Sequence, residues 1–179
     1  MADIKDPNVQ KVIDALNTAR RMEINAIHQY MVQHYLMDGY DLGELCAFLK
    51  LIAVDEMNHA EDFAERIDAL GGKPDCEMSG TIAQGQTVQQ IYPFDIDLES
   101  NTIKTYNELA EICHKAGDGA SAGLFNSIIS DEEIHLAYYK ETAHHIDTLG
   151  NAFLAKFAGT SKHTGPIKRF VKVQKKEKL

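Results

Sequence analysis

Two short motifs, in which a histidine follows a glutamate by three residues, are the clearest chemical feature of the sequence. They are Glu56-x-x-His59 and Glu132-x-x-His135. Residues at positions i and i+3 of an α-helix share one side, so the carboxylate and the imidazole of each motif can reach the same metal ion. Oxygen ligands with one histidine per metal suit iron or manganese, and zinc also tolerates them.

Both motifs belong to a longer repeat. Glu23 precedes Glu56 by 33 residues, Glu99 precedes Glu132 by 33 residues, and the whole pattern recurs after 76 residues. The segments that begin at Glu23 and Glu99, EINAIHQY and ESNTIKTY, also share Glu, Asn, Ile and Tyr at the same offsets. The repeat therefore predicts two similar helical hairpins, each with a single glutamate on one helix and a Glu-x-x-His motif on the other.

Six potential metal ligands on four helices of one bundle are typical of a centre that holds two metal ions. Four carboxylates buried together cannot all stay ionised without cations, and two Fe(II) ions would supply the compensating charge. We predict that Glu56 and Glu132 bridge the two iron ions. The four terminal ligands would be Glu23 and His59 on one ion, and Glu99 and His135 on the other.

The residues beside these ligands have two interpretations each. Asp55 and Asp131 directly precede the bridging glutamates, and they either accept hydrogen bonds from the ligand histidines or are plain solvated acids. Tyr30 and Tyr106 lie seven residues after the first glutamate of each half, ~20° from the same helical face. A tyrosine there either supplies an electron or a hydrogen bond to the metal centre, or is an ordinary core residue. We count Tyr30 among the catalytic candidates.

Apolar residues at helical spacing, separated by glycines, predict the elements that position these side chains. The expected helices cover about residues 7–37, 41–70, 87–116 and 120–149, with a short fifth helix at 152–157. Asp41 and Glu44 form the pattern of a capping box that opens the second helix. The middle connection is long enough to cross the bundle, since ~15 extended residues reach ~50 Å. We therefore predict an all-α four-helix bundle of two antiparallel hairpins with a long crossover.

Composition and charge restrict the class of protein. The chain of 179 residues has 44% hydrophobic and 25% charged residues, the balance of one globular domain, which we place at residues 1–159. Residues 160–179 carry seven Lys or Arg and one Glu, and we expect a solvated, flexible basic tail there. Because the net charge is −9 in spite of this tail, the body is acidic and disfavours nucleic acid as a partner.

Targeting signals and cysteine motifs are not found. No segment approaches the ~20 apolar residues that a membrane span needs. The first ten residues, MADIKDPNVQ, lack the apolar run of a secretory signal, so we expect a cytoplasmic protein. The three cysteines have no CxxC spacing, which favours idle thiols over a disulfide framework or a cysteine-bound metal.

With these motifs the sequence resembles the bacterioferritins, the haem-containing members of the ferritin-like family. All six di-iron ligand positions of that family are present, and the resemblance extends over nearly the whole chain. Bacterioferritins also carry a methionine directly after the bridging glutamate of the first motif. Here that residue is Met57, within Asp55-Glu56-Met57-Asn58-His59.

The resemblance implies a fold, an activity and an assembly. The fold would be the ferritin-like bundle, and the subunits would assemble from dimers into a hollow homo-oligomeric shell of 24. Each subunit would be an iron-storage ferroxidase with two iron ions, which oxidises Fe(II) with O2 or hydrogen peroxide and stores the ferric mineral inside. Met57 is rotated ~100° from Glu56, and in the family this methionine and its twin from a second subunit ligate one haem. An electron-donor redox protein would then act as a partner.

Two other functions fit parts of the sequence. A rubrerythrin-like di-iron peroxidase would use a similar centre without mineral storage. It predicts an extra glutamate ligand and usually a rubredoxin module with paired CxxC motifs, which the sequence lacks. A DNA-binding shell would use the Lys-rich residues 162–179, but the acidic body argues against it.

Overall fold

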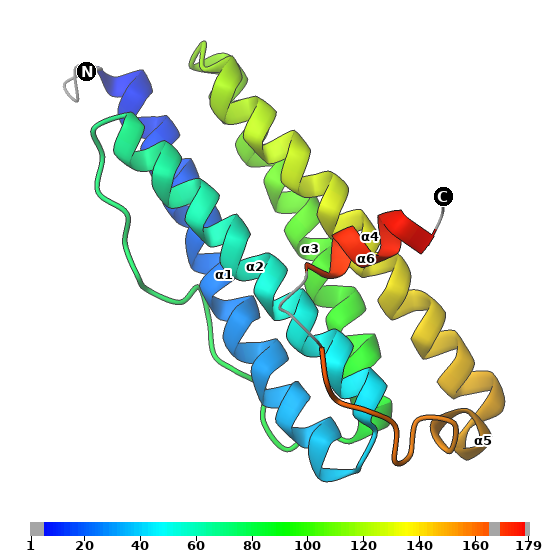
Figure 1. Cartoon of the computed structure of the whole chain (residues 1–179). Coiled ribbons are helices and arrows are strands. Elements are labelled where there is room, and N and C mark those ends of the chain that lie inside the picture. Colours follow the sequence, from blue (N-terminus) through cyan, green and yellow to red (C-terminus); the bar gives the residue numbers. More distant parts are fainter. Residues whose placement is uncertain (1–5, 165–168, 178–179) are drawn as a thin grey trace.

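The computed structural model describes residues 6–164 and 169–177, and it confirms the all-α class with four long helices and a short fifth one (Figure 1). The helices are α1 Pro7–Gly39, α2 Gly43–Ala69, α3 Val88–Lys115, α4 Gly119–Leu149, α5 Asn151–Leu154 and α6 Phe170–Glu177. In this described part of the chain, no helix combines the length and the apolar character needed to cross a membrane.

Local sequence signals explain most of the helix ends. The Asp6 side chain accepts a hydrogen bond from the Asn8 amide and Pro7 follows it, so α1 begins as predicted. A capping box of Thr87 and Gln90 opens α3. Gly117 lies between α3 and α4 with a φ of 79°, a left-handed conformation that favours glycine.

The predicted capping box at the start of α2 is wrong. Asp41 has a φ of 58°, and the residue that caps α2 is Leu42, whose side chain forms no capping hydrogen bond. The reason is a tertiary contact. The Asp41 carbonyl accepts a hydrogen bond of 2.9 Å from the Gly159 amide, which ties this turn to the chain that follows α5.

The segment between α2 and α3 is the predicted long crossover. It runs beside α1 from one end of the bundle to the other (Figure 1). The Ser79 amide donates to the Arg21 carbonyl at 3.1 Å, and the Ala83 amide donates to the Gln29 side chain at 2.8 Å. Because the crossover spans the bundle, α3 starts at the end where α2 starts, so α2 and α3 run parallel. The hairpins α1–α2 and α3–α4 are antiparallel because each has a turn of only a few residues.

The apolar core consists of two clusters, one toward each end of the bundle. The cluster toward the α5 end has Leu45, Leu49, Ile52, Tyr92, Tyr139 and Phe153 among its members. The cluster toward the other end has Leu16, Phe63, Ile67, Tyr106, Leu109 and Phe125 among its members. Buried polar and charged side chains are also present in the bundle, and they include the six predicted metal ligands.

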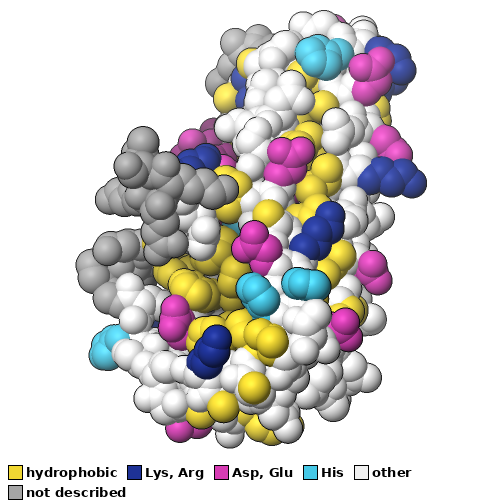
Figure 2. Space-filling model, turned by 90° about the vertical axis from the view of Figure 1, so that its right-hand side faces the viewer, with side chains coloured by type: hydrophobic (Ala, Val, Ile, Leu, Met, Phe, Trp, Pro, Cys, Tyr) yellow, Lys and Arg dark blue, Asp and Glu magenta, His cyan; other side chains and the backbone are white. Residues whose placement is uncertain are grey.

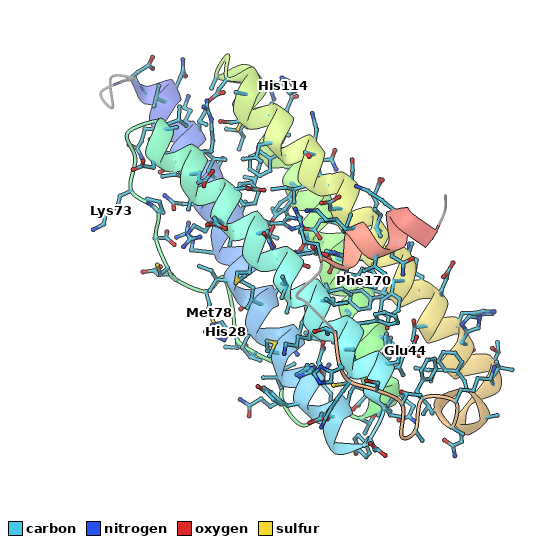
Figure 3. The ribbon with its side chains drawn as sticks, viewed as in Figure 1. His28, Glu44, Lys73, Met78, His114 and Phe170 are labelled. Carbon is cyan, nitrogen blue, oxygen red and sulfur yellow. The ribbon has the colours of Figure 1, made fainter. Side chains whose placement is uncertain are left out.

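The part of the expected basic tail that the structure describes is not solvated throughout. Helix α6 lies across α2 and α4, and Phe170 points into the bundle near its middle (Figures 1 and 3). Phe170 is fully buried and Val171 is nearly so. On the face shown in Figure 2, Lys and Arg side chains are separated from one another by acidic and apolar ones.

Candidate metal centre

All four long helices contribute to one buried cluster of acids and imidazoles. The structure brings together all six residues that the sequence predicts as ligands, and each is at most 2% exposed. They are Glu23 from α1, Glu56 and His59 from α2, Glu99 from α3, and Glu132 and His135 from α4. Helical packing alone therefore places the two halves of the repeat face to face.

The cluster divides into two sets of four residues, and each set could hold one metal ion. Within each set the ligand atoms all lie within 4.8 Å of one another. The first set is Glu23, Glu56, His59 and Glu132, and the second is Glu56, Glu99, Glu132 and His135. Glu56 and Glu132 belong to both sets, which is the arrangement that two bridging carboxylates require.

The Nδ1 atom of each histidine points at the two shared carboxylates. His59 Nδ1 lies 2.9 Å from Glu56 Oε2 and 3.2 Å from Glu132 Oε1. His135 Nδ1 lies 2.9 Å from Glu132 Oε2 and 3.1 Å from Glu56 Oε1. Glu56 Oε1 and Glu132 Oε1 have no hydrogen-bond partner among the described residues. Buried orphan oxygens beside nitrogen lone pairs fit the ligation of cations.

The charges of the cluster also favour bound cations. Burial and the charges of Glu132 and Glu56 raise the pKa of Glu23 well above its ordinary value, and the same causes raise the pKa of Glu99. Burial also opposes the ionisation of Glu132, but the two histidines outweigh it and lower its pKa to about 2. The two histidines alone do not provide enough positive charge to keep all four glutamates ionised. Divalent cations bound between the glutamates would provide the rest.

The aspartates that precede the shared glutamates face the outer nitrogens of the histidines. His135 Nε2 lies 3.4 Å from Asp55 Oδ2, and His59 Nε2 lies 3.6 Å from Asp131 Oδ2. Each aspartate reaches the histidine of the opposite hairpin. At His135 the carboxylate of Asp55 favours the tautomer with its hydrogen on Nε2, which leaves Nδ1 free for a metal.

Two tyrosines donate hydrogen bonds to Glu23 and Glu99, the glutamates that each belong to only one set of ligands. The Tyr30 hydroxyl donates to Glu99 Oε1, and the Tyr106 hydroxyl donates to Glu23 Oε1 at 2.5 Å. Burial, followed by the charge of the adjacent glutamate, raises the pKa of both tyrosines well above its ordinary value. Both hydroxyls thus remain donors, and the two halves use their tyrosines in the same way.

Sequence reasoning missed one residue of the site, Arg169. Its Nε donates to Asp55 Oδ1 at 2.7 Å, and its Nη2 donates to Asp131 Oδ2 at 3.2 Å. The same Nη2 lies 3.1 Å from Nε2 of His59. The available signal was the apolar pair Phe170-Val171 within a basic tail, because a solvated arm has no reason to carry it.

Met57 lies outside the cluster, as its position beside Glu56 predicts. Met57 is a large apolar residue that is not buried in the single chain, and 53% of it is exposed. The thioether is therefore accessible on the flank of α2, away from the two sets of ligands.

Comparison with known proteins agrees with this geometry. Residues 13–149 match the model of the ferritin family, described as a ferritin-like domain. The bacterioferritin of Desulfovibrio desulfuricans is 50% identical over 165 residues, which cover 92% of each chain. The bacterioferritin BfrA of Mycobacterium tuberculosis is 31% identical over 145 residues, which cover 81% of this chain and 89% of that one.

Comparison with solved structures agrees with these sequence matches. An X-ray structure of the D. desulfuricans bacterioferritin, with its diiron site in different catalytic states, has a TM-score of 0.90 and 48% identity, and the match covers 94% of this chain and 98% of that one. The Rhodobacter capsulatus bacterioferritin, solved with a metal-free dinuclear site and with haem iron, has a TM-score of 0.81 and 28% identity, covering 92% and 100%. The chain therefore belongs to the ferritin-like family, and within that family to the bacterioferritins.

Proposed function

We propose that this chain is an iron-storage ferroxidase that holds two iron ions at the cluster of four glutamates and two histidines. The observation that carries the proposal is the sharing of Glu56 and Glu132 by two complete sets of ligands. The relatives support it, since a diiron site is described for the D. desulfuricans protein. Two Fe(II) ions would lose one electron each. The two electrons, together with two protons from solvent, would reduce O2 to hydrogen peroxide or hydrogen peroxide to two water molecules.

The side chains of the cluster have distinct roles in this proposal. Glu56 and Glu132 would hold both metal ions, while the other four residues would hold one ion each. Asp55 would keep the Nδ1 lone pair of His135 directed at the metals. Asp131 lies beside the outer nitrogen of His59. Tyr30 fixes the orientation of Glu99 through its hydroxyl, and this hydroxyl is near enough to the centre to exchange a proton or an electron.

Alanine at Glu56 or at His135 tests the ferroxidase. Each change removes a ligand, so we expect rapid Fe(II) oxidation to be lost while the helical content and the native mass stay unchanged. Glu61→Ala on α2 and His144→Ala on α4 are matched controls, because both residues are exposed on the same helices. Wild-type oxidation rates in Glu56→Ala and His135→Ala would defeat the proposal.

The proposed shell has 24 copies of the chain around a cavity that stores ferric mineral. The acidic body supports this assignment, because a negative surface attracts cations. Native mass measurement tests it, since a 24-subunit shell of a 20.0 kDa chain is far larger than a dimer. A dimer in solution would favour the rubrerythrin-like peroxidase instead.

We also propose that Met57 ligates a haem shared by two subunits. The exposed thioether is the supporting observation, and the R. capsulatus relative was solved with haem iron. The visible spectrum of the purified protein should show haem bands, and Met57→Ala should remove them. Met78→Ala is the control, because Met78 is similarly exposed, at 46%, but lies in the crossover (Figure 3). Equal haem content in both variants would contradict the assignment.

A further inference from the structure

The proposed metal centre is closed on the side of α1 and α3. Tyr30 and Tyr106 lie on these helices beside the unshared glutamates, and both tyrosines are fully buried. Each is fixed by its hydrogen bond to a glutamate, and Tyr106 also packs against Phe63 and Phe125. A metal ion that passes on this side would have to displace tightly packed aromatic rings.

The side of α2 and α4 is different, because polar groups there connect the centre with solvent. Asp55 and Asp131 lie directly behind the two histidines. The side chains of Asp131 and Arg169 are 17% and 24% exposed, whereas those of the histidines are at most 1% exposed. A polar path between the proposed metals and solvent thus runs past the two aspartates.

Helix α6 covers this path. Arg169 bonds both aspartates, the Val171 amide donates to Asp55 Oδ2 at 3.0 Å, and Lys175 Nζ lies 3.0 Å from Asp131 Oδ1. Two cations therefore neutralise two carboxylates that would otherwise attract metal ions. With these ion pairs formed, the carboxylates of Asp55 and Asp131 are not available to bind a metal ion.

An aromatic anchor holds the cover in place. The Phe170 ring lies 4.9 Å from the ring of Tyr138 and 5.6 Å from that of Phe48, and it is 6.0 Å from the imidazole of His135. Its full burial explains why a helix of only eight residues can dock on the bundle. Phe170 therefore sets where Arg169 can reach.

We propose, on the basis of the metal centre proposed above, that Arg169 and α6 form a gate on the α2–α4 side of that centre. A metal ion passes between the centre and this surface after Arg169 has left Asp55 and Asp131. The two aspartates then bind the ion in transit, because carboxylates are good ligands for hard divalent cations. With Arg169 in place, the same oxygens are occupied and the path carries no net negative charge.

Exchange of Co(II) tests the gate without any measurement of oxidation. The full-length protein is loaded with Co(II), whose visible absorption reports its ligands, and is then mixed rapidly with excess EDTA at 0.15 M NaCl. The reverse experiment mixes the metal-free protein with Co(II). The variants are Arg169→Gln, which removes the gate residue, and Phe170→Ala, which removes the anchor.

Lys172→Gln is the matched control. Lys172 is exposed on α6 and carries the same charge as Arg169. Within residues 6–164 and 169–177, no ion pair of its side chain with Asp55 or Asp131 is present. Circular dichroism of each variant verifies that the bundle is folded.

We expect both the binding and the release of Co(II) to become about 10-fold faster in Arg169→Gln, because the two aspartates then form a negative path, and such paths raise association rates by ~10-fold or more. Phe170→Ala should act in the same direction, because Arg169 loses its anchor. Lys172→Gln should keep wild-type rates. An unchanged association rate in Arg169→Gln would overturn the gate, even if Co(II) were released faster, because a residue that only positions the histidines does not obstruct binding.

Equal acceleration in Lys172→Gln and Arg169→Gln would also overturn the gate, since it would indicate a general effect of charge. The failure of the proposed function has a different signature. If the wild-type protein binds fewer than two Co(II) ions per chain, the proposed centre is wrong, and the gate is wrong with it.

Discussion

Gly43, the first residue of α2, lies against the backbone of the segment that follows α5. A Cβ atom at this position would be 1.9 Å from the Thr160 carbonyl oxygen and 2.7 Å from its carbon. Both atoms belong to the backbone, so no side-chain rotation can relieve the contact. In Gly43→Ala the segment around Thr160 must therefore move away from α2.

The cost of this movement can be worked out from the contacts that it breaks. The Glu44 amide donates to Thr160 Oγ1 at 2.9 Å, and the Gly159 amide donates to the Asp41 carbonyl at 2.9 Å. Each bond contributes ~1 kcal/mol to stability, whereas alanine regains at most ~1 kcal/mol over glycine in a helix. With some loss of packing, the net destabilisation is ~1–2 kcal/mol, which corresponds to a decrease in Tm of roughly 3–6 °C for a chain of this size.

Thermal unfolding followed by far-ultraviolet circular dichroism measures this effect. Gly123→Ala is the matched control, because a Cβ atom at Gly123, within α4, would have no neighbour within 4 Å. The control should raise Tm slightly, since alanine favours the helix by up to ~1 kcal/mol. A Gly43→Ala protein that is as stable as Gly123→Ala would refute the packing of the segment against α2.

Three further changes have defined outcomes. Asp118→Asn removes the negative charge that pairs with Arg66 and one of the two oxygens that accept hydrogen bonds from its Nη2. Urea unfolding should therefore show a loss of ~1–2 kcal/mol near neutral pH. Its neighbours lower the pKa of Asp118 against the opposing effect of burial, so this contribution is present above the ordinary aspartate pKa of ~4 and is lost as the pH falls through the lower folded value. Tyr30→Phe removes the donor to Glu99, and calorimetry should show ~10-fold weaker Co(II) binding. Phe125→Ala opens a cavity at a fully buried site and should cost ~3–5 kcal/mol in urea unfolding.

Each of these changes has an outcome that would contradict it, and the last two have a matched control variant. A stability difference for Asp118→Asn that does not decrease as the pH falls below ~4 would argue against the ion pair. Tyr35→Phe, at a residue that is 65% exposed, should leave Co(II) binding unchanged, and equal weakening in both tyrosine variants would remove Tyr30 from the centre. Ile112→Ala is the control for Phe125→Ala, because Ile112 is 39% exposed, and it should cost less than ~1 kcal/mol. An equally small loss in Phe125→Ala would contradict the burial of Phe125 in the core.

The helices and the six clustered residues could be predicted because their signals are local or periodic. Glycines and caps mark most helix ends, and the 76-residue repeat identifies Glu23 and Glu99 as partners of the two Glu-x-x-His motifs. A helix presents its residues with fixed geometry, so four helices packed antiparallel bring these side chains together once the fold is known. For the same reason, the reciprocal bonds of Tyr30 and Tyr106 follow from their equal offsets.

The features that could not be predicted depend on contacts between distant parts of the chain. Asp41 followed by Glu44 has the pattern of a capping box, but the Gly159 amide fixes the turn in another conformation. Arg169 belongs to a run of basic residues whose composition is that of a solvated tail. Its charge says nothing about its partners, Asp55 and Asp131, which lie 114 and 38 residues away in the sequence.

The tail also breaks the symmetry that the repeat creates. A segment that occurs once cannot contact both halves of a duplicated centre in the same way. The Arg169 guanidinium reaches Nε2 of His59, whereas the ring of Phe170 packs beside His135. A cation near one histidine and an aromatic ring near the other give two sets of identical ligands different surroundings. The two proposed metal positions are thus equivalent in the duplicated hairpins and inequivalent in the folded chain.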